Sequence, residues 1–142
     1  MKITAQDRGK YLRGMLLLID KDQHILENEK SWFIKLSKIL GYDIEFCRTA
    51  LLELPENEYL ENTPPKFSNS EIAKAFIVDG IHLAYADRQM TPNELLWINS
   101  VAEINGVDIL LGIQEFEKFR KQKYSESDVF KFEVEKLFEK GV

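Results

Sequence analysis

The sequence has little of the chemistry on which covalent cross-links and thiolate metal sites depend. Among its 142 residues there is one cysteine, Cys47, which excludes an internal disulfide and a metal site built from several thiolates. Histidine occurs only twice, and the sequence has no glycine-rich phosphate loop, paired zinc-ligand motif or nucleophile elbow. Because Cys47 lies on an apolar stripe, we interpret it as a small core residue rather than a nucleophile.

Long apolar runs are also missing. The apolar stretches on either side of Asp79 are far shorter than the roughly 20 residues of a membrane-spanning helix. The first residues lack the apolar core of a signal peptide, so we expect a cytoplasmic protein without a membrane span. The net charge of -5 disfavours a nucleic-acid partner. We interpret the basic cluster at 118–123 as a solvated helix end.

Apolar residues recur at helical spacing along most of the chain. The pattern predicts helices at about 4–20, 27–40, 43–54, 69–86 and 92–105, then one from Asp108 and a last one at about 126–140. In the sixth segment Ile109, Ile113, Phe116 and Phe119 fall on one helical face. No segment alternates convincingly with a period of two, so the sequence predicts an all-α fold of about seven helices.

Capping residues mark the ends of these helices. Thr91 and Glu94 have the spacing of a capping box, with Pro92 at the first helical position. The other expected capping residues are Asp43, the pair Ser68 and Glu71, and the pair Ser125 and Asp128 at helix starts, with Gly41 and Gly106 at helix ends.

The two halves of the chain match at an offset of 65 residues. At this offset the only two tryptophans, Trp32 and Trp97, coincide. The other coincident pairs include Asp22 with Asp87, Glu29 with Glu94, Gly41 with Gly106 and Asp43 with Asp108. We interpret the match as two pseudo-symmetric three-helix repeats, about 4–54 and 68–123. A loop at 55–67 joins them, and the final helix packs over the seam of a single domain.

The order of these features resembles the TerB-like family of tellurite-resistance proteins. Twice, a helix is followed by Asp-x-x-(apolar)-x-x-x-Glu opening a second helix and Gly-x-Asp opening a third. The resemblance covers roughly Gly9 to Phe119 and is strongest from Leu83 to Gly106. It implies an all-helical fold with acidic residues proposed to bind metal ions. The family turn usually runs Asp-Gly, whereas here the residues after the two aspartates are Gln23 and Arg88.

Two acidic turns are the candidate cation sites. The candidate ligands are Asp20, Asp22 and Glu29 in the first turn, and Asp87 and Glu94 in the second. Each Asp-to-Glu spacing equals that between positions five and twelve of an EF-hand loop, but the glycine and first ligand of that loop are missing. A weak divalent-cation site, for calcium or a similar ion, is one interpretation. The other, which we favour, is that the aspartates bond to their turns and the glutamates cap helices.

Asp79 and His82 lie one turn apart on the expected central helix. They could share a metal ion or a hydrogen bond. The pair is not repeated in the first half of the chain, because the positions 65 residues earlier hold Gly14 and Leu17. We favour a buried hydrogen bond between Asp79 and His82, because a buried charge needs a partner.

Three functions follow from these features. We favour a non-enzymatic TerB-like interaction module, weakly linked to a cation, with a protein partner in a stress or envelope-associated assembly. The second is a metal-dependent enzyme using Asp79, His82 and the turn carboxylates. The third is a homo-oligomeric structural protein that makes contacts through its aromatic last helix. The sequence identifies neither the partner nor the oligomeric state.

Overall fold

The computed structural model describes residues 3–21, 27–53, 63–84, 90–121 and 132–140, which form seven α-helices and no β-strand. The helices are α1 (Ala5–Asp20), α2 (Glu27–Ile39), α3 (Ile44–Glu53), α4 (Ser70–Ala84), α5 (Pro92–Ile104), α6 (Ile109–Lys121) and α7 (Glu133–Lys140). The predicted all-α fold is confirmed. None of the described helices is long and apolar enough to cross a bilayer.

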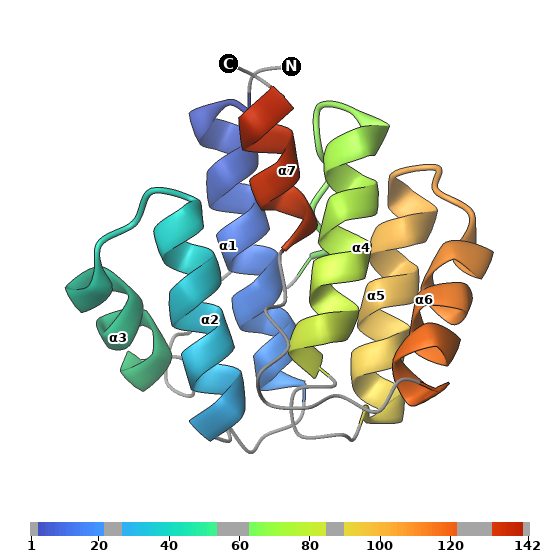
Figure 1. Cartoon of the computed structure of the whole chain (residues 1–142), viewed down its shortest axis with the longest axis horizontal. Helices are drawn as coiled ribbons and strands as arrows, with labels where there is room; N and C mark the ends of the chain where they lie inside the picture. The colour runs from blue at the N-terminus through green and yellow to red at the C-terminus, as the bar shows by residue number, and fades with distance from the viewer. Residues whose placement is uncertain (1–2, 22–26, 54–62, 85–89, 122–131, 141–142) are drawn as a thin grey trace.

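Viewed as in Figure 1, the first six helices follow from left to right in the order α3, α2, α1, α4, α5 and α6, with α7 drawn in front between α1 and α4. Helix α4 is the centre, because it packs against α1, α2, α5, α6 and α7. Ten of its fifteen residues are buried. This placement agrees with a sequence that is apolar on most sides of the helix.

The close approach of α1 and α4 depends on Gly14. A Cβ atom at Gly14 would lie 2.6 Å from Cε2 of Phe76 and 3.0 Å from Cγ of Pro65. The indole N–H of Trp97 on α5 donates a hydrogen bond to the carbonyl oxygen of Gly14 at 3.1 Å. One glycine on α1 therefore receives side chains from α4, from α5 and from the segment before α4.

Gly41 and Gly106 end α2 and α5, as predicted. Their φ angles are +97° and +67°, in the left-handed region that glycine adopts without a Cβ penalty. The next residue in each case donates its amide to the carbonyl five residues back, at 3.0 Å for Tyr42 and 2.9 Å for Val107. Both helix ends are therefore Schellman motifs.

Two of the predicted helix starts are confirmed by their hydrogen bonds. Thr91 Oγ1 accepts from the amide of Glu94 at 3.2 Å, and Glu94 Oε1 accepts from the amide of Thr91 at 2.9 Å. Asp43 Oδ1 accepts from the amide of Phe46 at 2.8 Å at the start of α3.

The capping box predicted to start at Ser68 is wrong. Asn69 caps α4 instead, because its Oδ1 accepts from the amide of Ile72 at 3.0 Å. Ser68 donates its amide and its hydroxyl to the carboxylate of Asp7 on α1, at 3.0 and 2.5 Å. Burial acts to raise the pKa of Asp7, but hydrogen bonds from Ser68 and Thr4 hold it below its ordinary value. Ser68 therefore ties the segment before α4 to α1.

The helix starts follow the 65-residue offset found in the sequence. Helices α1, α2 and α3 begin at residues 5, 27 and 44, and α4, α5 and α6 begin at 70, 92 and 109. The packing of the third helices differs, since α6 packs against both α4 and α5, whereas α3 packs mainly against α2. The structural equivalence of the two halves stays a prediction.

The two tryptophans occupy different surroundings. Trp97 is buried and bonds to α1, as described above. Trp32 is half-buried on α2, and its ring meets that of Phe132 edge-on with centroids 5.6 Å apart. Cys47 is fully buried, which confirms it as a core residue.

Candidate functional site

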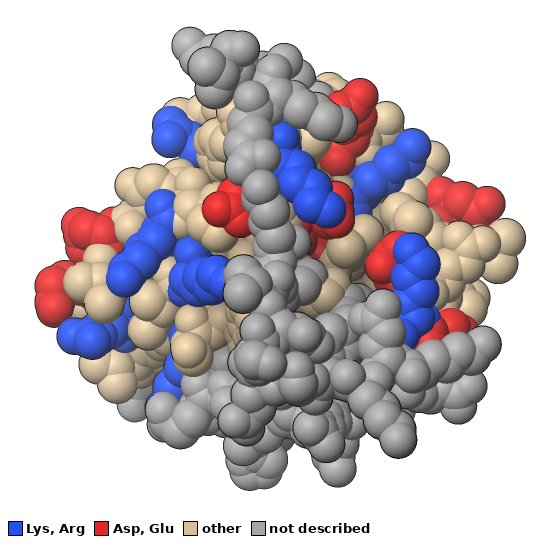
Figure 2. Space-filling model, viewed as in Figure 1, with Lys and Arg blue, Asp and Glu red and all other residues tan. Residues whose placement is uncertain are grey.

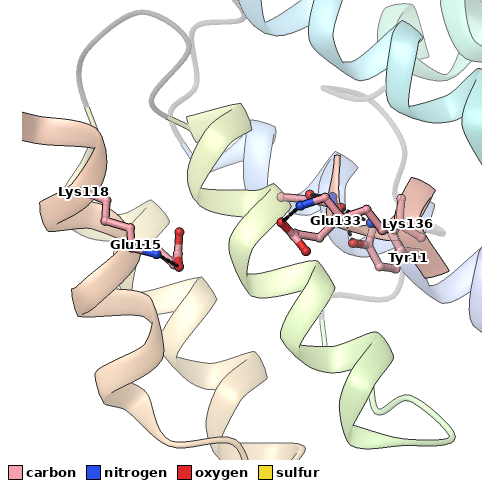
Figure 3. A network of polar contacts seen from close by, with 7 residues as sticks. Tyr11, Glu115, Lys118, Glu133 and Lys136 are labelled. Atoms are coloured by element: carbon pink, nitrogen blue, oxygen red, sulfur yellow. Dashed lines mark hydrogen bonds and ion pairs between the residues drawn. The ribbon is translucent and has the colours of Figure 1, made fainter. Parts of the chain in front are cut away.

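A buried carboxylate in the middle of the central helix joins three helices. Asp79 on α4 has no exposed surface. Its Oδ2 accepts hydrogen bonds from the Tyr11 hydroxyl at 2.6 Å and from the amide of Val134 at 3.1 Å. Its Oδ1 accepts from the amide of Glu133 at 2.7 Å. Figure 3 shows how Tyr11 on α1 and Glu133 on α7 come together at this point.

Asp79 acts as the N-terminal cap of α7. The first amides of a helix have no partners within the helix, and Phe132, the residue before α7, has no side-chain acceptor for them. The carboxylate of Asp79 supplies both acceptors, and a negative charge is favourable beside the positive end of the helix dipole. A residue more than fifty positions earlier in the chain therefore caps α7.

The start of the last helix differs from the prediction. Residue 132 is not helical and α7 begins at Glu133, later than the expected start near residue 126. The predicted caps Ser125 and Asp128 lie outside the described residues. What fixes the start of α7 is a tertiary contact with Asp79, which the local sequence does not contain.

Burial and hydrogen bonding act on the pKa of Asp79 in opposite directions. Burial raises it, the bonds from Tyr11 and the two α7 amides lower it, and the charge of Glu133 raises it, with a net value of about 7. Burial and the Asp79 charge raise the pKa of Tyr11 well above 10, so Tyr11 remains a neutral donor. Asp79 therefore changes its charge near neutral pH in the folded chain.

The predicted hydrogen bond between Asp79 and His82 is wrong. The bonds to the Asp79 carboxylate come from Tyr11 and the start of α7 instead. Burial lowers the pKa of His82 to about 2, and the positive charge of Lys136 on α7 adds to this effect. His82 is therefore neutral at physiological pH, and it does not supply a positive charge to Asp79.

Charged side chains around the site lie on the surface of α7. Lys136 Nζ lies 2.8 Å from Oε1 of Glu133, and both side chains are partly exposed. A similar pair, Lys118 and Glu115 at 3.2 Å, lies on α6 (Figure 3). Over the described part of the face in Figure 2, positive and negative side chains are interspersed. Lys118, from the predicted basic cluster, is therefore half of an ion pair.

The acidic-turn residues fall into three groups. Asp22 and Asp87 lie outside the described residues. Asp20 is exposed at the end of α1, while Glu29 and Glu94 are buried in the first turns of α2 and α5. Glu94 has the capping role that we favoured. Within the described ranges, no three side chains of the types that ligate metals are grouped closely enough to hold an ion. Cation binding at the turns stays a prediction.

Helix α6 carries an apolar stripe that faces outward. The α6 stripe consists of Ile109, Leu110 and Ile113, with side chains 43%, 55% and 45% exposed. Ile113 is a helical neighbour of both other residues, because it lies four positions after Ile109 and three after Leu110. At the 65-residue offset, Leu110 and Ile113 correspond to Glu45 and Arg48 of α3, which form an exposed ion pair at 3.7 Å. These two helix positions are thus charged in the first half of the chain and apolar in the second.

Two features of these sites were not found in the sequence. Tyr11 was missed as the partner of Asp79, although a tyrosine within an apolar stripe needs a partner for its hydroxyl. The outward direction of the α6 stripe was missed because periodicity identifies an apolar face but not what covers it.

Comparison with protein-family models, with curated proteins and with solved structures finds no match to this chain.

Proposed function

We propose that this chain is a non-enzymatic interaction module of the TerB-like type, which binds a protein partner through the α6 stripe. The observation that carries the proposal is the exposure of three large aliphatic side chains on one face of α6. The two acidic-turn motifs and the Gly-x-Asp helix starts support the TerB-like type. A stress or envelope-associated assembly is the setting we propose for it.

The α6 stripe is not needed to build a helix at this position. The corresponding positions of α3 hold Glu45 and Arg48, which suit an exposed helix face. Full burial of a side chain such as leucine or isoleucine contributes about 1.5–3 kcal/mol, so covering three half-exposed side chains would contribute roughly 3 kcal/mol. This gain is available only when another surface covers the stripe.

The surroundings of the stripe suit a protein partner. Glu115 and Lys118, which form an ion pair, lie further along the same helix. An apolar centre with charged residues beside it is the usual composition of a protein interface. The partner surface should therefore present aliphatic or aromatic side chains at its centre and polar groups at its edge.

The geometry favours an enzyme less. A metal-dependent reaction at Asp79 and His82 requires a carboxylate that is open to an ion or substrate, whereas Asp79 has no exposed surface and both of its oxygens accept hydrogen bonds. These bonds account for the burial of Asp79 as a structural contact between α1, α4 and α7.

Site-specific photo-cross-linking tests the proposal. A photoreactive amino acid replaces Leu110 in the full chain, and cross-linked products are collected from cells that naturally express it. We expect a discrete protein adduct at this position. Leu52, which is 81% exposed on α3, provides the matched control position. Equal and diffuse labelling at both positions would contradict the proposal.

The cation link is tested separately by thermal unfolding. We expect calcium in the millimolar range to raise the melting temperature slightly, because stabilisation depends on the ligand concentration relative to its dissociation constant. Asp22→Asn with Glu29→Gln should remove this shift without unfolding the chain. A wild-type melting temperature that no divalent ion changes would leave the turns as capping devices.

A further inference from the structure

The arginine in the first turn of α1 carries a charge that no described carboxylate neutralises. Nε of Arg8 is buried and has no hydrogen-bond partner. Over the described ranges, no carboxylate or carbonyl oxygen bonds to the rest of its guanidinium group either, and the two terminal nitrogens remain open to solvent. Buried polar groups are nearly always paired, and a partly desolvated charge attracts a counter-charge more strongly than a hydrated one. Arg8 therefore presents donors that suit an anion from outside the chain.

The Arg8 guanidinium lies where α1 begins and α2 ends. A Cβ atom at Gly41 would lie 3.3 Å from Nη1 of Arg8, and a Cβ atom at Gly9 would lie 3.7 Å from the hydroxyl oxygen of Tyr42. Each of the two side chains thus reaches the chain neighbour of the other. The Tyr42 hydroxyl bonds to no acceptor in the described part of the chain and is also open to solvent. A charged donor and a neutral donor therefore occur at the same contact between helix ends.

An aromatic surface continues from Tyr42 onto the first turn of α3. The rings of Tyr42 and Phe46 are stacked, with centroids 5.3 Å apart and planes 18° from parallel. Phe46 is 50% exposed. An exposed aromatic ring offers a large, rigid area for packing against another apolar or aromatic group. We call Arg8, Tyr42 and Phe46 together the Arg8 site.

The residues of the Arg8 site are not needed to end a helix at this position. The positions 65 residues later hold Ala73, Val107 and Leu111, which supply neither a cation nor an aromatic ring. Nevertheless α2 and α5 end with the same Schellman motif, as described above. The combination of guanidinium, hydroxyl and stacked rings therefore belongs to the first half of the chain alone.

We infer that the Arg8 site binds a carboxylate that carries an aromatic group. The planar guanidinium matches a carboxylate through two parallel hydrogen bonds, and the Tyr42 hydroxyl adds a third donor. The aromatic group packs against the stacked rings of Tyr42 and Phe46. One guanidinium balances one negative charge, whereas the carbonyl end of α2 and the net charge of -5 disfavour a phosphate or a polyanion. Viewed as in Figure 1, α2 and α3 are at the opposite edge from α6, so this inference is independent of the proposed function.

Titration of the isotope-labelled full chain with N-acetylphenylalanine, followed by NMR, tests the inference. The Nε–H of Arg8 is the direct readout, because its burial slows exchange with water. N-acetylphenylalaninamide is the matched ligand control, since it keeps the ring and lacks the carboxylate. Arg8→Lys keeps a positive charge at the end of α2 but removes the planar fork. Arg48→Gln is the matched protein control, because it removes an exposed arginine that already pairs with Glu45.

We expect a saturable shift of the Arg8 Nε–H signal with the acid and none with the amide. Arg8→Lys should weaken binding by about tenfold or more, and Tyr42→Phe by about two- to tenfold, because they remove a charge-assisted and a neutral hydrogen bond. Arg48→Gln should leave the affinity unchanged. Equal binding of acid and amide, no saturable shift, or an unchanged affinity in the Arg8→Lys variant would overturn the inference. The comparison of acid with amide uses the wild-type chain, so it does not depend on the folding of any variant.

A small aromatic acid and the C-terminal phenylalanine of a peptide present the same chemistry, and a second ligand distinguishes them. The second ligand is an acetylated Gly-Gly-Gly-Phe peptide with a free carboxylate. Binding as tight as that of N-acetylphenylalanine supports the end of a peptide as the natural ligand. Binding of N-acetylphenylalanine alone supports a small aromatic acid.

Discussion

Replacing Asp79 removes the acceptor of three donors at once, two of them buried and one partly buried, and this makes it the most informative position for stability. The donors are the Tyr11 hydroxyl and the amides of Glu133 and Val134. A buried donor without a partner costs about 1–3 kcal/mol, which gives an upper range of about 3–9 kcal/mol for Asp79→Ala. Because α7 can detach and return its two amides to water, we expect a smaller loss of about 2–4 kcal/mol.

The pH dependence separates the charge of Asp79 from its hydrogen bonds. Its pKa is about 7 in the folded chain, against 3.8 as the ordinary value. Because Asp79 holds its proton more tightly in the folded chain than in the unfolded chain, protonation stabilises the fold. This contribution is fully present below pH 3.8 and is lost as the pH rises through 7. In the Asp79→Asn variant this side chain does not titrate, so the pH-dependent contribution is absent. We therefore expect this substitution to destabilise the chain by about 2–3 kcal/mol more at pH 5 than at pH 8, at 1.36 kcal/mol per pKa unit.

Urea unfolding at pH 5 and pH 8, followed by circular dichroism and tryptophan fluorescence, measures this difference. Tyr11→Phe is the control, because it removes one donor but keeps the titrating carboxylate. We expect it to cost about 1 kcal/mol and to lose at least as much stability between pH 5 and pH 8 as the wild type does, because the Tyr11 bond lowers the pKa of Asp79. A loss for Asp79→Asn that is equal at both pH values, or larger at pH 8, would refute the assignment of a raised pKa to Asp79.

Two further predictions concern the packing and the helix caps. Gly14→Ala should lower the free energy of unfolding by about 1–3 kcal/mol, because its Cβ would lie 2.6 Å from the Phe76 ring. At Gly9 in the same helix, an added Cβ would have its nearest contact at 3.7 Å, so Gly9→Ala should instead stabilise the chain by roughly 0.5–1 kcal/mol. Equal effects of the two substitutions in thermal melts would show that Gly14 is not needed for the α1–α4 contact. Thr91→Ala should cost about 0.5–2 kcal/mol through loss of the capping box. A neutral result in urea unfolding would show that the cap contributes nothing.

Local signals in the sequence predicted most of the helix boundaries. Gly41, Gly106, Asp43 and the Thr91–Glu94 box act within one turn of the helices that they start or end, so their effect is contained in neighbouring residues. The all-α fold followed from apolar periodicity in the same way. The resemblance to the TerB-like family and the structural repeat stay predictions.

The features that the sequence did not predict depend on contacts between distant residues. Ser68 bonds to Asp7, which lies sixty-one positions away, so that Asn69 becomes the cap of α4. Asp79 bonds to Tyr11 and to the start of α7, and not to its neighbour on the helix, His82. In each case a local partner was expected, and the fold supplied one from a distant part of the chain.

One double substitution separates the proposed role of the α6 stripe as a binding surface from a role in the core. Leu110→Glu with Ile113→Arg introduces the residues found at the corresponding positions of α3. The measurement compares this variant with wild type for the adduct formed by a photoreactive group at Ile109, together with urea unfolding of both. We predict an unfolding free energy within about 2 kcal/mol of wild type and loss of the adduct, because about half of each side chain is already covered in the fold and the exposed half is available for binding. A folded variant that keeps the adduct, or a variant that loses several kcal/mol of stability, would contradict the claim.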